Sequence, residues 1–286
     1  MLHRFGQYEL LHHLASGGMA EVYLARRLGV EGFTRELVVK RMLPQLSIDA
    51  ECVSMFLDEA RLTAMLQHPN IAQVHDLGRI DDTYFIAMEF VDGPHLGNLV
   101  KRSIGHDDPL PIDLCAWIVA RMAEGLDHAH EREDPITGQP LGIVHRDVNH
   151  ANVLISRHGM VKVTDFGVAR ATGQRATTRS GAIKGKIGYI SPEQCLNEPF
   201  DRRADVWALG VVLYELLTHS RLYHEKSDLE TLDRIVNEPY KPASTVNDSL
   251  DVEIDQILSR ALAKKPAERT ATAAILAEEL ERWLQA

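Results

Sequence analysis

The hydrophobic pattern of the chain changes at one point, and this change limits the folds open to it. Residues 8 to about 90 read as short strands interrupted by a single helix. After the Gly93–Pro94 break, long stretches of helical periodicity begin, first from Ile112 to Glu131. We therefore predict an α+β architecture with two lobes. A small antiparallel β-sheet lobe with one helix occupies 1–91, and a larger, mostly helical lobe occupies 92–286.

Composition excludes several classes of partner. The 286 residues are 45% apolar, enough to fill a sizeable core. A net charge of -10 argues against a nucleic-acid or anionic-membrane binder. The longest apolar stretch, VWALGVVLYELL, is too short to span a bilayer. Three widely spaced cysteines suggest neither disulfides nor zinc, so we expect a cytoplasmic domain with no membrane span in this segment.

The predicted helix of the small lobe, from Asp49 to Gln67, carries a carboxylate on an apolar stripe. Glu59 lies among apolar neighbours at helical spacing, and such a carboxylate is costly to bury unless it meets a cation. Lys40 ends the apolar strand VVK, so its side chain either extends to solvent or pairs with Glu59. Pairing would explain both residues.

A glycine turn, LASGGMAEV, precedes that strand. Gly17 and Gly18 lie between two strand-like runs, where the lack of a Cβ would let backbone amides approach a phosphate group. A plain hairpin turn explains the same residues. The turn alone does not decide between these interpretations.

Three polar residues in the second lobe suggest a single site. In IVHRDVNHANVLIS and VKVTDFG, Asp147 lies on an irregular loop, Asn152 opens a strand and Asp165 closes its hairpin partner. Oxygen ligands at Asn152 and Asp165 suit Mg²⁺, and Asp147 would then orient an attacking hydroxyl and accept its proton. Each residue alone is a common turn former. Their combination indicates phosphoryl transfer.

With these motifs in order, the chain resembles a eukaryotic-type protein kinase, and within that family it is similar to bacterial serine/threonine kinases. The resemblance covers residues 8–284 and includes LASGGMAEV, VVK, DEA, MEFVDG, HRD, DFG, SPE and DVWALG. It implies the bilobal kinase fold and transfer of the ATP γ-phosphate to protein hydroxyl groups. It also implies that Lys40 holds the α- and β-phosphates and pairs with Glu59, and that Asp147 is the catalytic base.

The resemblance further implies the residues that surround the cofactors. Magnesium, or manganese in its place, would bind Asn152 and Asp165. Met88 would be the gatekeeper beside the adenine. The residues implied to bind ATP are Leu14, Ala15, Gly17, Gly18, Val22, Val38, Lys40, Glu89, Val91 and Leu154.

Two structural contacts are implied in the same way. Glu193 of SPE is expected to pair with Arg269 of AERT. Asp205 is expected to brace the HRD loop from a buried helix. Both contacts support the fold rather than the chemistry.

The chain departs from the family pattern near Asp147. Ala15 and Ala20 replace two glycines of the turn, and Asn149 stands where serine/threonine kinases usually have a lysine. Lys186 replaces the threonine of the substrate-docking loop that this lysine contacts. We hypothesise a swap in which Lys186 extends toward Asp147 and supplies the missing charge. A solvated lysine is the alternative.

The stretch from Gly167 to Pro192 contains basic residues but no carboxylate. A disordered, solvated segment is one interpretation. Phosphorylation at Thr177, Thr178 or Ser180 would supply anions that order it, and a homodimer would allow this autophosphorylation to occur in trans. The cations concerned are Arg170, Arg175, Arg179, Lys184 and Lys186, together with Arg146.

Other functions share parts of this pattern. A pseudokinase serving as a nucleotide-binding scaffold would explain the altered glycine turn, but it does not need the intact aspartates. A small-molecule phosphotransferase would lack SPE and DVWALG. Relaxed or tyrosine acceptor specificity also stays open, because Asn149 replaces the residue that most often marks serine/threonine kinases. The favoured prediction is a serine/threonine kinase.

Overall fold

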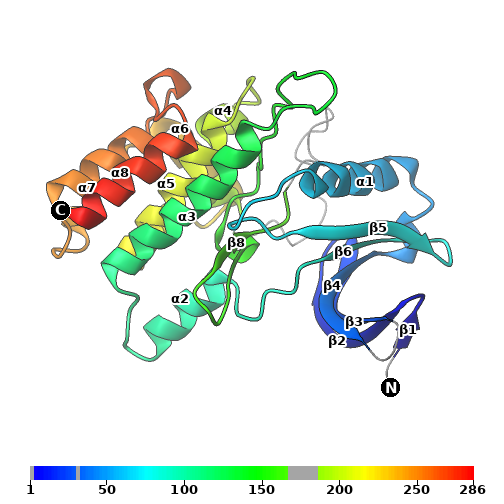
Figure 1. The fold of residues 1–286 in the computed structure, drawn as a ribbon. Coiled ribbons are helices and arrows are strands. Elements are labelled where there is room, and N and C mark those ends of the chain that lie inside the picture. The colour runs from blue at the N-terminus through cyan, green and yellow to red at the C-terminus, as the bar shows by residue number, and fades with distance from the viewer. Residues whose placement is uncertain (1–2, 30–32, 167–185) are drawn as a thin grey trace. The chain divides into compact units, whose positions relative to one another are not determined.

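The structure, a computed structural model, describes residues 3–29, 33–166 and 186–286. These residues form two compact units (Figure 1). The first unit contains the described residues up to 92 except 69–71, which belong to the second unit together with residues 93 onward. The division between the units follows Asp92.

The first unit is built on an antiparallel sheet. Its described residues form six strands in the order β1-β2-β3-β4-β6-β5. The strands are β1 His3–Phe5, β2 Tyr8–Ser16, β3 Ala20–Leu28, β4 Thr34–Met42, β5 Val74–Ile80 and β6 Thr83–Met88. One helix, α1 Ala50–Ala64, begins where Asp49 accepts hydrogen bonds from the backbone N–H groups of Glu51 and Cys52. These elements match the predicted β-sheet lobe with one helix.

Alternation along the strands gives this sheet two different apolar faces. One face packs against α1, where Met42, Val74 and Ile86 of the strands cluster with Phe56 and Ala60 of the helix. The other face includes Phe5, Tyr8, Leu10, Leu37, Val39 and Phe85. Lys40 lies between Val39 and Arg41 in β4, so its side chain shares the face of Met42 and α1.

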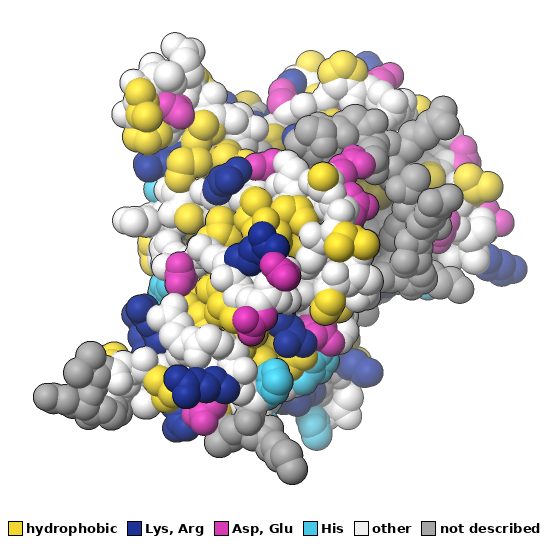
Figure 2. Space-filling model, turned by 90° about the vertical axis from the view of Figure 1, so that its right-hand side faces the viewer, with side chains coloured by type: hydrophobic (Ala, Val, Ile, Leu, Met, Phe, Trp, Pro, Cys, Tyr) yellow, Lys and Arg dark blue, Asp and Glu magenta, His cyan; other side chains and the backbone are white. Residues whose placement is uncertain are grey.

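A surface pocket lies on the opposite face of this sheet. It has a volume of about 220 Å³ and is lined by His3, Leu10, Leu11, His12, His13, Tyr23 and Arg41. Figure 2 shows histidine side chains gathered on one part of the described surface. Because Tyr23 and Arg41 alternate with Lys40 across the sheet, this pocket is separate from the face that carries Lys40.

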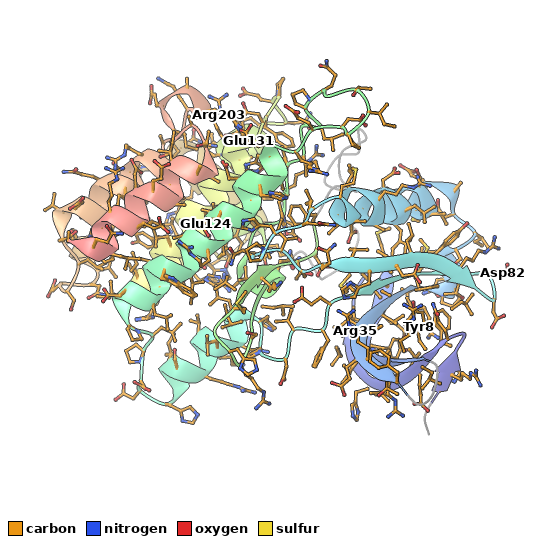
Figure 3. All side chains as sticks on the ribbon, viewed as in Figure 1. Tyr8, Arg35, Asp82, Glu124, Glu131 and Arg203 are labelled. Carbon is orange, nitrogen blue, oxygen red and sulfur yellow. The ribbon has the colours of Figure 1, made fainter. Side chains whose placement is uncertain are left out.

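Helices form most of the second unit (Figure 1). They are α2 Leu96–Gly105, α3 Ile112–His130, α4 Pro192–Cys195, α5 Arg203–Thr218, α6 Asp228–Asn237, α7 Val252–Ala261 and α8 Ala273–Gln285. The α3 helix packs against α5 and α8. Glu131 follows the C-terminal end of α3, and Arg203 marks the start of α5 at the same end of the unit (Figure 3). The two helices are therefore antiparallel neighbours.

Burial of α5 is complete, as its apolar sequence predicts. Its residues from Ala204 to Thr218 are all buried, including Asp205 and Glu215. Both carboxylates therefore need partners inside the protein. Through these two carboxylates, α5 can anchor the loops of the site.

A small hairpin supports the candidate site. It consists of β7 Val153–Ile155 and β8 Val161–Val163, with Val153 opposite Val163. Close to it, a Cβ atom added to Gly93 would lie 1.9 Å from the carbonyl oxygen of Ile155, so only glycine fits there. Asn152 belongs to the short 3₁₀ helix η3 His150–Asn152, one residue before the strand that it was predicted to open.

The predicted fold class is confirmed, and the helix expected from Ile112 to Glu131 is α3, which ends one residue earlier, at His130. The helix expected from Asp49 to Gln67 ends earlier, at Ala64. The α2 and α6 helices were not predicted, because few of their residues are buried. None of the helices in the described part of the chain combines the length and the apolar character needed to cross a membrane.

Candidate active site

Lys40 and Glu59 form an ion pair in the first unit. The Lys40 Nζ atom donates to Glu59 Oε1 over 2.7 Å. The lysine comes from β4 and the glutamate from α1, and both side chains are about one-sixth exposed (16% and 17%). The predicted contact is present, and the solvent-directed alternative for Lys40 is wrong. The phosphate-binding role of the pair stays a prediction.

The glycine turn joins β2 to β3. The Gly17 amide donates to the Ala20 carbonyl oxygen over 2.8 Å, which closes a tight turn. A Cβ at Gly17 would meet only the Ala20 oxygen, at 3.6 Å, and one at Gly18 would meet nothing within 4 Å. Neither glycine has a positive φ. The hairpin itself therefore does not require glycine at these two positions.

The other residues implied to surround ATP lie on or next to four strands of the first unit, β2, β3, β4 and β6, and on β7 of the second. Leu14 and Ala15 end β2, and both are exposed, whereas Val38 is buried in β4. Glu89 and Val91 follow β6, where the Glu89 amide donates to the Gln73 carbonyl oxygen over 2.8 Å. Val22 lies in β3, Met88 ends β6, and Leu154 lies in β7.

Asp205 holds the loop that carries Asp147. Its carboxylate accepts from the His145 amide over 2.8 Å, from the Arg146 amide over 2.9 Å and from His130 Nε2 over 2.8 Å. Burial would raise the pKa of Asp205, but the hydrogen bond and charge of His130, with the His145 contacts, hold it below its ordinary value. Arg146 adopts a left-handed φ of 68°, a strained conformation that this buried anchor maintains. The predicted bracing is present.

His145 connects this loop to the end of β8. Its Nδ1 atom accepts from the Asp147 amide over 3.2 Å, and its Nε2 atom donates to the Thr164 carbonyl oxygen over 3.1 Å. Its ring also packs on Phe166, with centroids 4.6 Å apart. Asp165, between these contacts, has a left-handed φ of 56°. Two strained residues, Arg146 and Asp165, therefore lie at the site.

The Asp147 carboxylate receives three side-chain donors. Lys186 Nζ donates to Oδ2 over 2.7 Å, Asn152 Nδ2 to the same oxygen over 3.0 Å, and Asn149 Nδ2 to Oδ1 over 3.1 Å. The Asp147 side chain is 15% exposed and that of Lys186 is 38% exposed. The structure thus brings Lys186 to Asp147, as the swap hypothesis requires.

Asn149 has a local role that the sequence did not reveal. It is buried, its Nδ2 atom also donates to the Asp147 carbonyl oxygen over 2.8 Å, and its Oδ1 atom accepts from the Ala151 amide over 2.9 Å. The last bond caps η3. The side chain that replaces the usual lysine therefore shapes the loop rather than extending from it.

Asn152 and Asp165 are adjacent through the hairpin. The Thr164 amide donates to the Asn152 carbonyl oxygen over 3.0 Å, which places the following residue, Asp165, beside Asn152. Because Asn152 Nδ2 donates to Asp147, its Oδ1 atom is left for a hard cation. No group of three His, Cys, Asp or Glu side chains in the described residues forms another candidate metal site. The Asn–Asp pair fits a divalent metal.

The docking loop, residues 186–191, is supported by a buried ion pair. It contains the 3₁₀ helix η5 Ile187–Tyr189 and leads into α4. There, Arg269 donates to both oxygens of Glu193, over 2.7 and 2.8 Å, as predicted. Burial would raise the pKa of Glu193, but the bonds and charge of Arg269 lower it below the ordinary value. The predicted phosphorylation sites Thr177, Thr178 and Ser180 lie outside the described residues.

These features define the class of protein. A family model, the protein kinase domain, matches residues 8–280, and the chain belongs to that family. Members of the family use ATP and a divalent metal ion and phosphorylate proteins. The resemblance inferred from the sequence is thereby confirmed.

Individual relatives carry different acceptor names. The chain is 43% identical to the tyrosine-protein kinase MasK of Myxococcus xanthus, covering 99% of this chain and 44% of that protein. It is 36% identical to the serine/threonine-protein kinase PknB of Mycobacterium leprae, covering 98% and 43%. It is 34% identical to the serine/threonine-protein kinase PrkC of Bacillus subtilis, covering 94% and 39%. The chain spans less than half the length of these relatives.

The fold is similar to that of a solved kinase domain. The PknI kinase domain of Mycobacterium tuberculosis superposes with a TM-score of 0.71 at 29% identity, covering 98% of this chain and 96% of that one. This similarity confirms the kinase fold. It leaves the acceptor residue to be inferred from the site.

Proposed function

We propose that the chain is an ATP-dependent protein kinase that phosphorylates serine and threonine hydroxyls, including those of its own basic segment 167–192. The observation that carries this proposal is the Asp147 carboxylate, held by a buried anchor and contacted by one cation and two amides. A carboxylate fixed in this way suits a group that orients an acceptor hydroxyl and takes its proton. The names of PknB and PrkC support the choice of acceptor.

The first unit would bind the nucleotide. Lys40, oriented by Glu59, would contact the α- and β-phosphates, and Gly17 and Gly18 would let the backbone of the turn approach them. The open space around both glycines supports this role, because the turn does not need them for its own geometry. In this unit the adenine would bind among the apolar residues Leu14, Val22 and Val38, with backbone groups of Glu89 and Val91.

Asn152 and Asp165 would hold Mg²⁺, or Mn²⁺ in its place. The ion supplies positive charge that offsets the negative charge of the phosphates during transfer. Asn152 contributes Oδ1 because its amide nitrogen is committed to Asp147. Asn149 and Asn152 then hold the Asp147 carboxylate in place, and Lys186 offsets its charge from the docking loop.

Substitution of Asp147 tests this proposal. Asp147→Asn removes the proton acceptor but keeps the size of the side chain, so transfer to a generic protein substrate should fall by about 10²- to 10⁴-fold. Binding of ATP should persist, because other residues are proposed to bind the nucleotide. Equal transfer by the variant and the parent would contradict the proposal. ATP binding without transfer by the parent would instead indicate a nucleotide-binding scaffold.

A tyrosine acceptor is the second candidate, and three observations favour it. MasK carries the name of a tyrosine kinase, and this chain lacks the lysine that usually marks serine/threonine kinases. The Lys186 ammonium beside Asp147 would also stabilise a phenolate. Phosphoamino-acid analysis of the autophosphorylated chain separates the candidates, because phosphotyrosine alone would overturn the serine/threonine assignment.

Autophosphorylation between two copies is part of the proposal. Transfer in trans predicts an initial rate per molecule that rises with protein concentration, whereas transfer within one molecule predicts a constant rate. Phosphopeptide mapping should locate phosphate at Thr177, Thr178 or Ser180. We place the domain in the cytoplasm, where its free cysteines Cys52 and Cys195 and its ATP requirement are both accommodated.

A further inference from the structure

A buried polar network lies between α5 and the catalytic loop, residues 145–152. Its centre is the Tyr189 hydroxyl, which is 2.8 Å from His150 Nδ1 and donates to Glu215 Oε2 over 2.8 Å. Arg221 donates to the same hydroxyl and, over 3.2 Å, to the same glutamate oxygen. Tyr189 belongs to the docking loop and His150 follows Asn149 in η3. The network therefore connects the two loops.

The hydrogen bonds of Tyr189 determine which atom of His150 carries a proton. A tyrosine hydroxyl has one hydrogen and two lone pairs. The hydrogen goes to Glu215, so the lone pairs accept from Arg221 and from His150 Nδ1. His150 Nδ1 therefore carries the hydrogen of this contact.

The other nitrogen of His150 shows that this arrangement has a cost. Its Nε2 atom is buried and has no hydrogen-bond partner among the described residues. Leaving a buried polar nitrogen unpaired is unfavourable by about 1–3 kcal/mol. The ring is nevertheless oriented so that Nδ1, and not Nε2, meets Tyr189. The bond to the docking loop is the contact that the local structure preserves.

We propose that His150 is a positioning residue, which fixes the docking loop and thereby the acceptor relative to Asp147. This inference rests on the proposed transfer to a protein hydroxyl. The docking loop meets the catalytic loop at two points, Lys186 on Asp147 and Tyr189 on His150, which are three residues apart in each loop. One point of contact would let the docking loop pivot, whereas two fix its orientation.

Two substitutions of similar chemistry separate the hydrogen bond from the shape of the ring. The amide nitrogen of asparagine occupies the place of Nδ1, and that of glutamine the place of Nε2. H150N should therefore keep the bond to Tyr189, whereas H150Q should lose it. We expect H150Q to raise KM for the protein acceptor by about tenfold, and H150N by less than about threefold.

The readouts are KM for the acceptor and KM for ATP, measured on the 286-residue chain. KM for ATP should change by less than about twofold in both variants, because His150 acts on the acceptor side. H158N is the matched control, since His158 is exposed in the turn between β7 and β8. Y189F removes the contacts of the Tyr189 hydroxyl with His150, Glu215 and Arg221 together, so it should raise KM for the acceptor at least as much as H150Q does. Adding H150Q to Y189F should change KM little, because the bond that H150Q removes is already lost.

Several outcomes would overturn the inference. They are an unchanged acceptor KM in H150Q or Y189F, an equal rise in H150N and H150Q, and additive effects in the double variant. If H150Q does not fold, as judged by circular dichroism, H150A, which also lacks the bond, replaces it in the comparison with H150N. Absence of transfer by the parent chain would overturn the proposed function and this inference with it. Transfer by the parent with an unchanged H150Q would overturn this inference alone.

Discussion

Two ion pairs, one in each unit, have the same length but different surroundings. Lys40 and Glu59 in the first unit are 2.7 Å apart, as are Lys186 and Asp147 in the second. The first pair joins a strand to a helix. The second pair joins two loops, and Asp147 also receives two asparagine amides. The Lys186 side chain is more than twice as exposed as that of Lys40, at 38% against 16%.

This difference shows where the chain keeps the family pattern and where it departs from it. The region proposed to bind nucleotide retains the usual lysine and glutamate on regular elements. In the region proposed to bind the acceptor, the usual lysine is Asn149, and the cation comes from the docking loop at Lys186. We therefore expect substitution of Lys40 to change the kinetic parameters for ATP. Substitution of Lys186 should instead change phosphorylation of the protein acceptor.

The largest effect on stability is expected at a third, buried pair that touches neither substrate. Glu193→Gln leaves the Arg269 guanidinium, whose side chain is 0% exposed, without its anionic partner. The free energy of unfolding should fall by about 3–5 kcal/mol, as measured by urea denaturation. A loss below about 1 kcal/mol would show that this pair is not the support of the docking loop that the structure indicates.

The same pair predicts how the free energy of unfolding depends on pH. The pKa of Glu193 is lowered in the folded protein, so its contribution to stability is present above the ordinary glutamate pKa. That contribution is lost as the pH falls through the lower, folded value. The difference in unfolding free energy between the parent and Glu193→Gln should therefore shrink as the pH falls below about 4.5. A constant difference would contradict the assignment.

Lys40→Met tests the pair of the first unit. Loss of a cation at the phosphates should lower kcat/KM for ATP by about 10²- to 10³-fold. KM for the protein acceptor should change little, because Lys40 is proposed to act on the nucleotide. Lys101→Met, at an exposed position in α2, is the matched control. Equal losses in the two variants would show that Lys40 does not act on the nucleotide.

Asn149→Lys tests the swap in the second unit. The variant loses the hydrogen bond from the Ala151 amide by which Asn149 caps η3, and it places a second ammonium group near Lys186. The kcat should therefore fall by about tenfold. Adding Lys186→Thr restores the arrangement usual in the family and should recover part of the loss. If the double variant is less active than Asn149→Lys, the two positions do not exchange roles.

The smallest effect is expected at an exposed pair of the first unit. Arg26 contacts Glu9 between β2 and β3, with the two side chains 38% and 20% exposed. Glu9→Gln should lower the free energy of unfolding by less than about 1 kcal/mol. A larger loss would show that exposure does not rank the ion pairs of this protein.

Regular elements of the fold were predictable because their sequence patterns are local. The α5 helix follows from a run that is apolar on every side, and α1 follows from its two apolar stripes. The α2 and α6 helices were missed because they are short, with 10 residues each, and bury few residues. The bounds of η3 depend on the Asn149 cap, which the sequence alone does not distinguish from a turn.

The contacts of the site were predictable where the sequence showed that a residue needs a partner. A carboxylate on an apolar helix stripe predicted the partner of Glu59, and two altered positions predicted the contact of Lys186. The bonds from Asn149 to Asp147 and from His150 to Tyr189 were missed, because they depend on a loop bent at Arg146 and held by Asp205. Glu215 on the buried α5 helix was the signal that could have led to this network.

Turnover of Lys186→Met, compared with the parent, tests the central claim most directly. If Lys186 supplies the charge on the acceptor side, kcat for phosphorylation of a protein substrate should fall by about 10²-fold, with KM for ATP changed by less than about twofold. Lys101→Met should match the parent. An unchanged kcat in Lys186→Met would contradict the account.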